Sequence, residues 1–557
     1  MDRDVEAAPP RPPSTADDKK HEQEKPVSHA DGNQHHDDGE ALATEDSQST
    51  HNSARASLER YRSQNGYGVS DDPPQPAVPT YSQEKDPFEV GWDDGDNDPL
   101  CPRSFSKARK WMIVMICCGG SFTVTNLSSI YTATYEQMEA EFGNSRIISV
   151  LGLSTFVLGI AFGPMLFGPM SEFYGRRPIY LVAWTVFFLF IFPEAFGNNI
   201  ATIVVARFFG GFSGSTFLAV SGGTVGDLFQ KHELQAPMAM FALAPFLGPT
   251  TGPVVGGFIN YHVDWRWTYY VFLIWSFFLL LAIVFLVPET YHPILLRNKA
   301  RDLRKRTGDD RWLAPTEKVQ KSVIRAIGLS LLRPFQLLTF EPMCLNLCLL
   351  SAIVLGILYL FFGAFSLVFS TNYGFNLWQV GLSFVPISVG LFFATASDSV
   401  WHRIRARLVA NLERETGVKG KTEPEFRLPP AICGAVLAPV GVFIFAWTSY
   451  PHIHWIAPMI GSGVFGAGIL LIYTGIFTFL VDAYPLYAAS ALAANAFVRC
   501  IFAMSFPLFG IQMYEKLGYQ WASTLLAFLL LAMAPFPYIF FKYGKRIRKK
   551  SRYAAST

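Results

Sequence analysis

Twelve long apolar stretches constrain the fold more than any other feature of this 557-residue sequence. Each has about 17–25 mostly apolar residues, the length at which an α-helix crosses the hydrocarbon core of a bilayer. A backbone in hydrocarbon must satisfy its own hydrogen bonds, so these stretches are expected to be helical. They lie at 111–131, 147–168, 178–196, 201–221, 237–259, 269–287, 345–369, 380–397, 430–447, 456–480, 489–511 and 521–541. The sequence therefore predicts an all-α integral membrane protein with twelve transmembrane helices.

The stretches fall into two sets of six. A polar segment, 288–344, separates an N-terminal set within 101–287 from a C-terminal set within 345–541. The fourth stretch of each set is followed by an acid, Asp227 in the first and Asp482 in the second. Two halves of this kind, joined by a loop, are typical of secondary transporters built from internal repeats. We therefore expect two six-helix pseudo-repeat halves.

The distribution of Lys and Arg predicts the orientation. If the N-terminus is cytosolic, 32 of these bases lie in segments on the inner side and three in outer segments. Inner segments of membrane proteins carry the excess of positive charge. Both termini and the loop 288–344 are thus expected in the cytosol. The basic tail, 542–557, is expected to anchor this topology at the anionic inner leaflet.

Residues 1–100 differ in composition from the rest of the chain. They hold 23 of the 44 acids and only nine of the 46 bases, with few aromatic residues and no apolar period. Such a composition favours a disordered, acidic, cytosolic tail. The seven cysteines show no metal-ligand spacing and are interpreted as apolar packing residues. No nucleophile–base pair, metal set or nucleotide loop is recognisable, so we expect neither an enzyme nor a cofactor, nucleotide or nucleic-acid partner.

The fifth stretch contains an unusual pattern between Ala244 and Phe258. Its prolines are Pro245, Pro249 and Pro253, and its glycines are Gly248, Gly252, Gly256 and Gly257. In water each interior proline would cost a helix about 3 kcal/mol and each glycine about 1. In a bilayer the helix survives such residues, because the alternative leaves backbone groups unpaired. The pattern predicts a bent helix with one face that needs close backbone contact.

Two further patterns place charge at or inside the spans. The turn after the second stretch carries two glycines, one acid and two arginines, which are Gly168, Gly175, Glu172, Arg176 and Arg177. The fourth stretch contains Arg207 about seven residues from its start, too deep to be explained by snorkelling alone. An ionisable residue at such depth is by default a candidate functional residue.

These three patterns resemble, in order and in place, three motifs of the major facilitator superfamily. They are the loop 2–3 motif, the helix-4 arginine motif and the helix-5 motif of twelve-span drug:proton antiporters. Further pieces resemble the fungal branch of that group: 264–267, 288–291 and 495–499. The resemblance covers residues 101 to about 552. It departs from the usual pattern at Glu172, where the family usually has Asp, and at 398–405, where the equivalent second-half loop lacks the glycines.

The resemblance implies a latch in the first half only. We expect Arg176 to interact with Glu172 and Asp227 and so join the ends of the second and fourth spans. This cluster would close the cytoplasmic gate and break when that side opens.

Proton coupling is implied by the resemblance, but the sequence shows no acid near the middle of any span. Arg207 either polarises the proton site or binds an anionic group of the substrate, or else it caps helix carbonyls. Arg499 has the same alternatives. Glu139 and Glu194 are candidate proton acceptors if they line the outward vestibule, although solvation at the surface is the simpler interpretation.

The expected cargo follows from the many phenylalanines and the few charges in the spans. They favour lipophilic, neutral or weakly cationic compounds, with Asn126, Asn495 and Arg499 as candidate cavity residues. The expected function is export of drugs, fungicides or toxic metabolites by proton antiport across the plasma membrane, by a monomer with small-molecule and proton partners. An importer of a nutrient, a polyamine carrier and a non-transporting receptor remain as alternatives.

Overall fold

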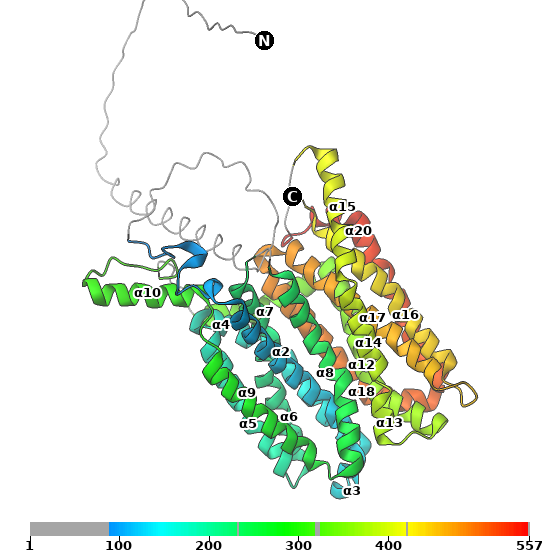
Figure 1. The fold of residues 1–557 in the computed structure, drawn as a ribbon. Helices are drawn as coiled ribbons and strands as arrows, with labels where there is room; N and C mark the ends of the chain where they lie inside the picture. Colours follow the sequence, from blue (N-terminus) through cyan, green and yellow to red (C-terminus); the bar gives the residue numbers. More distant parts are fainter. Residues whose placement is uncertain (1–87, 231–232, 318–322, 419–421, 555–557) are drawn as a thin grey trace, which may run out of the picture. The chain divides into compact units, whose positions relative to one another are not determined.

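The computed structural model describes residues 88–554 except 231–232, 318–322 and 419–421. Within these residues the regular elements are helices, and the only β pairing is an isolated bridge between Glu89 and Leu313. The expected disorder of the acidic head falls mostly on residues 1–87, which lie outside the described part. Figure 1 shows the helices.

The first half contains six candidate spans. Its helices are α2 (Lys107–Ile130), α3 (Tyr135–Phe142), α4 (Arg146–Tyr174), α5 (Arg176–Phe196), α6 (Ile200–Gly214), α7 (Thr216–Leu228), α8 (Gln235–His262) and α9 (Arg266–Leu286). Helices α2 and α3 form one span through the 3₁₀ turn Tyr131–Thr134, and α6 with α7 forms another. The polar segment after α9 contains α10 (His292–Thr307) and α11 (Val323–Phe340).

The second half also contains six candidate spans. Its helices are α12 (Pro342–Tyr373), α13 (Leu377–Leu382), α14 (Val385–Ala396), α15 (Asp398–Thr416), α16 (Pro429–Thr448), α17 (Ile456–Ala483), α18 (Ala488–Leu517), α19 (Tyr519–Met533) and α20 (Pro535–Arg548). Helices α13, α14 and α15 follow each other within one span, as do α19 and α20. The prediction of twelve spans is confirmed in the described residues.

Helix α8 is continuous despite its three interior prolines, as the bilayer argument predicts. Its glycines serve two neighbours. A methyl group added at Gly248 would lie 2.7 Å from the Asn126 backbone nitrogen, and one at Gly252 would lie 2.8 Å from the Ile130 nitrogen, both on α2. A methyl group at Gly257 would instead lie 2.9 Å from the Leu377 carbonyl oxygen at the start of α13. The glycine pattern thus allows close packing within the first half and against the second.

The two halves touch through hydrogen bonds between helices. The hydroxyls of Ser128 and Tyr359 lie 2.9 Å apart, joining α2 to α12. Those of Thr250 and Ser388 lie 2.7 Å apart, joining α8 to α14. Ser154 of α4 donates to a backbone carbonyl of α18 at 2.7 Å. These contacts hold the halves together in the conformation described.

Residues 88–100 differ from the predicted disordered head. Val90 is buried with Leu296, Ala300 and Ala314 in a small apolar cluster against α10. In addition, Lys299 of α10 forms ion pairs with two aspartates of this segment, at 2.8 Å to Asp93 and 3.1 Å to Asp98. The expectation of disorder is therefore wrong for residues 88–100.

Candidate functional site

The turn between α4 and α5 is built around Gly175. Its φ is +98°, a conformation that favours glycine, and an added methyl group would lie 2.3 Å from a carboxylate oxygen of Glu289. Glu289 accepts hydrogen bonds from the backbone nitrogens of Arg176 at 2.9 Å and Arg177 at 3.2 Å. An acid at the first turn of a helix satisfies free N–H groups and complements the helix dipole. The glycine is needed because Glu289 occupies the space of a side chain.

Arg176 lies in a buried cluster that joins the end of α7 to this turn. Its Nε lies 3.2 Å from Oδ2 of Asp227, and the two side chains are 4% and 1% exposed. Its Nη1 donates to the Ser171 hydroxyl at 2.6 Å, and its guanidinium carbon lies 4.6 Å from the centre of the Tyr291 ring. A buried pair with this many partners fixes two helix ends relative to each other.

The other residues expected in this latch have different surroundings. Glu172 is half-buried in the last turn of α4, and its pairing with Arg176 stays a prediction. Arg177 is exposed and donates to the Val284 carbonyl at 3.0 Å. A methyl group at Gly168 would have no neighbour within 4 Å, so the structure gives no steric reason for a glycine there.

His292, at the start of α10, extends the cluster. Its Nε2 donates to the backbone carbonyl of Asp227 at 2.9 Å, and the side chain is buried. Burial lowers the pKa of His292 to about 4, although the hydrogen bond to the carbonyl favours the charged form. The imidazole is therefore neutral at physiological pH. Trp92 packs edge-on against its ring at 5.7 Å, which ties the segment 88–100 to the same place.

Arg207 is fully buried in α6 and has a carboxylate partner. Its Nη1 lies 3.3 Å from Oε2 of Glu194, and both side chains are 0% exposed. Its other nitrogens donate to carbonyl oxygens of Gly152 at 2.8 Å, Leu127 at 3.2 Å and Ser128 at 3.3 Å. The contact with Glu194 fits the interpretation that Arg207 polarises a proton site. The hydrogen bonds to carbonyls of α2 and α4 fit the interpretation that it is a structural arginine. The expectation that Glu194 is solvated at the surface is wrong, because α6 packs over it.

Several buried polar atoms in and around this pair have no hydrogen-bond partner. The Arg207 guanidinium carbon lies 4.0 Å from the centre of the Tyr131 ring. Oε1 of Glu194 and the hydroxyls of Tyr131 and Tyr269 are buried without a hydrogen-bond partner. Glu139 lies outside this cluster, where it pairs with Arg146 at 3.2 Å and is one-quarter exposed. Glu194 is therefore a buried acid with one unpartnered oxygen, a property that it shares with Asp227, whose Oδ1 is also buried without a partner.

The second half has its own ion pair at the matching place. Arg427, just before α16, lies 2.7 Å from Asp482 at the end of α17. In each half, an acid at the end of the fourth span therefore meets an arginine at the start of the third. We expected a latch in the first half only, because the equivalent loop at 398–405 lacks the glycines, and so the Arg427–Asp482 pair was not predicted. In that loop, Asp398 accepts a hydrogen bond from Gln235 of α8 at 2.8 Å.

The basic tail contacts acids of the protein. Arg548 forms two hydrogen bonds to Glu425, at 2.8 and 2.9 Å, and both side chains are almost fully buried. Ser551 donates to Glu341 at 2.7 Å. The tail thus packs against the second half, and its composition alone does not predict this contact.

The three candidate cavity residues have different partners. Asn126 donates to Thr251 at 2.8 Å and thereby ties α2 to α8. Asn495 donates to the Ser351 hydroxyl at 2.6 Å, and its Oδ1 is buried without a partner. Arg499 lies 5.4 Å from the centre of the Tyr473 ring, with its Nε buried and unpartnered. No group of His, Cys, Asp or Glu that could hold a metal ion occurs among the described residues.

Sequence reasoning missed several residues of these clusters. Ser171, His292 and Tyr291 complete the first cluster, while Arg427 and Arg548 form those of the second half. Glu289 and Tyr291 left a signal, since both lie in a segment, 288–291, that resembles the fungal branch. Ser171 lies in α4 between two residues of the expected latch, Gly168 and Glu172, but was not singled out. The others have no distinctive sequence pattern around them.

Comparison with known proteins agrees with this geometry. The family model described as Major Facilitator Superfamily matches residues 115–507. The chain is 54% identical over 462 residues to "Efflux pump atB" of Aspergillus terreus, covering 83% of this chain and 89% of that protein. It is 41% identical over 473 residues to "Probable drug/proton antiporter YHK8" of Saccharomyces cerevisiae, covering 84% and 91%.

A solved structure supports the fold. The xylose transporter XylE from E. coli, in a partially occluded inward-open conformation, aligns with a TM-score of 0.54 at 16% identity. The alignment covers 78% of this chain and 99% of that one. With twelve spans and a family match over most of its length, this chain is a multi-pass membrane protein. It belongs to the Major Facilitator Superfamily.

Proposed function

We propose that this chain is a secondary active transporter that exports small lipophilic organic compounds in exchange for protons. The names of its relatives, an efflux pump and a drug/proton antiporter, support export and antiport. We place it in the plasma membrane as a monomer, with both termini and the segment 288–344 in the cytosol, because the 32 bases of the inner segments favour that orientation.

The observation that carries the proposal is the buried Glu194–Arg207 pair. A carboxylate that is 0% exposed depends on its cation, and removing either charge from a buried pair is strongly destabilising. Protonation of Glu194 would remove the attraction while leaving Arg207 on the carbonyls of α2 and α4. Because these carbonyls belong to two other spans, a proton on Glu194 changes what holds α2, α4, α5 and α6 together. That is the coupling that an antiporter requires.

The cluster around Arg176 supports alternating access. It fixes the end of α4, whose Ser154 contacts α18 of the other half. Opening the side that we place in the cytosol requires α4 to move away from α18, which the Arg176–Asp227 pair opposes. We assign Gly175, Arg177 and Glu172 to the same gate.

The experiment measures efflux of a fluorescent lipophilic dye from cells that express the full chain, with and without a protonophore. We expect the protonophore to abolish efflux and Glu194→Gln to reduce it strongly, because glutamine keeps the shape but cannot exchange a proton. Glu136→Gln is the matched control, since Glu136 is an exposed acid on α3. Location and membrane delivery are followed with a fluorescent tag.

Two results would reject the proposal. Efflux that persists unchanged with the protonophore would exclude proton antiport. Uptake driven by an inward proton gradient would instead support the importer alternative. A normal Glu194→Gln protein would remove Glu194 from the coupling mechanism and leave the carrier to be sought at Glu139.

A further inference from the structure

The two arginines within the spans have opposite surroundings. Arg207 has a carboxylate and three carbonyls. For Arg499 of α18, no described carboxylate or backbone carbonyl accepts a hydrogen bond from the guanidinium, and Nε is buried without a partner. A cation at this depth without a counter-charge is costly. Arg499 can therefore donate hydrogen bonds to an anion.

Aromatic rings flank this guanidinium. Its central carbon lies 5.4 Å from the ring centres of Tyr473 and Phe477, both on α17. Ring faces attract the cation but offer no strong hydrogen-bond acceptor, so the directional donors stay available. One turn earlier on α18, Oδ1 of Asn495 is a second buried polar atom without a partner. These two polar atoms without partners lie on successive turns of α18 and so define one site on this helix.

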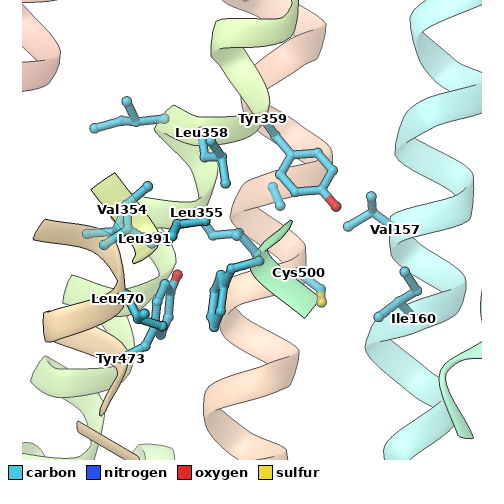
Figure 2. Close-up of a cluster of buried hydrophobic side chains, with 14 of the residues drawn as sticks. Val157, Ile160, Val354, Leu355, Leu358, Tyr359, Leu391, Leu470, Tyr473 and Cys500 are labelled. Carbon is cyan, nitrogen blue, oxygen red and sulfur yellow. The ribbon is translucent and has the colours of Figure 1, made fainter. Parts of the chain in front are cut away.

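That place lies where the two halves meet. The Tyr473 ring stacks on Phe246 of α8 at 4.6 Å, so α17 contacts the first half through the same ring that flanks Arg499. Figure 2 shows Cys500, the next residue of α18, pointing toward Val157 and Ile160 of α4. In a transporter with two halves, the substrate binds at this junction near the middle of the membrane.

The other side chains at the junction are apolar or already bonded. The residues drawn in Figure 2 include Val354, Leu355 and Leu358 of α12 and Leu470 of α17. The Tyr473 hydroxyl donates to the Ser351 carbonyl at 2.6 Å. The junction thus offers one available cation in apolar and aromatic surroundings, which fits one negative charge on a lipophilic molecule.

We propose that Arg499 binds the single acidic group of an aromatic or otherwise apolar monoanionic cargo, with a carboxylate as the simplest case. A planar guanidinium can donate two parallel hydrogen bonds to a carboxylate, while Tyr473 and Phe477 contact the apolar part. This inference rests on the proposed export function and names its substrate class. It replaces the sequence-based expectation of neutral or weakly cationic cargo.

The test compares two probes that share a ring system and differ in charge. The full-length chain in nanodiscs is titrated calorimetrically with 2-naphthoate and with the neutral 2-naphthamide. We expect the wild-type chain to bind the naphthoate about ten-fold or more tightly, as for a hydrogen bond to a charged group. Arg499→Gln should remove this preference and leave naphthamide binding within about two-fold of wild type.

Lys516→Gln is the control, because Lys516 is an exposed cation at the far end of the same helix. Arg499→Lys keeps the charge without the planar fork and should retain part of the preference. A wild-type chain that binds both probes equally would overturn the proposal, as would a preference that survives in Arg499→Gln. Binding needs no proton gradient, so this result is independent of whether efflux is proton-driven.

Discussion

Replacing Asp227 by Asn tests the gate most directly, because it removes one charge and almost no volume. The Arg176 Nε and Asp227 Oδ2 lie 3.2 Å apart with both side chains buried. At an effective dielectric of about 20, unit charges at that distance attract by about 5 kcal/mol. Asparagine keeps one acceptor oxygen, so we expect a loss of about 3 kcal/mol, at the lower end for breaking a buried pair.

This loss converts into a change in gate population. If the pair forms only when the gate is closed, about 3 kcal/mol lowers the closed-to-open ratio by about 100-fold. The change can be measured by pulsed electron resonance between spin labels on cysteines at Gln235 and Asp398. These residues touch across the two halves, at 2.8 Å between their side chains. We expect short distances in the parent and a large population of longer distances in Asp227→Asn.

Controls separate gating from misfolding. Asp310→Asn makes the same chemical change at an exposed site and should leave the distances unchanged. The unlabelled native cysteines are corrected for with a parent that lacks the two added ones. If Asp227→Asn folds, reaches the membrane, transports normally and keeps the parental distance distribution, the gating argument fails.

Further predictions concern the surroundings of this gate. Gly175→Ala should lose transport through strain and collision with Glu289, whereas Gly168→Ala should behave as wild type in the same efflux assay. Gly252→Ala should lower thermal stability by about 1–3 kcal/mol because the methyl group meets the α2 backbone, as measured by unfolding of the purified protein. His292 has a folded pKa of about 4, below its unfolded value, so its contribution to stability is present above about pH 6.5 and is lost toward pH 4. Backbone hydrogen exchange in α10 should therefore become faster on acidification, and His292→Gln should remove this pH dependence. The other groups that act on His292 are Asp227, Arg176, Asp96 and Arg103.

The sequence predicts the spans well because hydropathy is a local property of each helix. It also predicts the continuity of α8, since the bilayer rather than propensity decides there. It places Glu194 at a helix end, yet cannot show that Gly210 of α6 leaves room for this carboxylate. Nor can it show that Glu289 from the end of α9 meets the turn at Gly175. Burial of this kind depends on which helices are neighbours, and the sequence does not state this. In the sequence, Arg427 looks like any other basic residue of an inner segment that favours the orientation of the chain in the membrane.

The crossing of α8 and α13 has a consequence for how the halves move. A methyl group at Gly381 would lie 2.5 Å from the Pro253 carbonyl oxygen, so backbone touches backbone where Gly257 faces the start of α13. Such a contact costs no side-chain conformational entropy, because glycine has no rotamers. Little free energy therefore opposes a rotation of the two helices about it. We therefore expect this crossing to act as a pivot, around which the halves tilt while remaining in contact. Labels placed on either side of this crossing should keep a constant separation while those at Gln235 and Asp398 move apart.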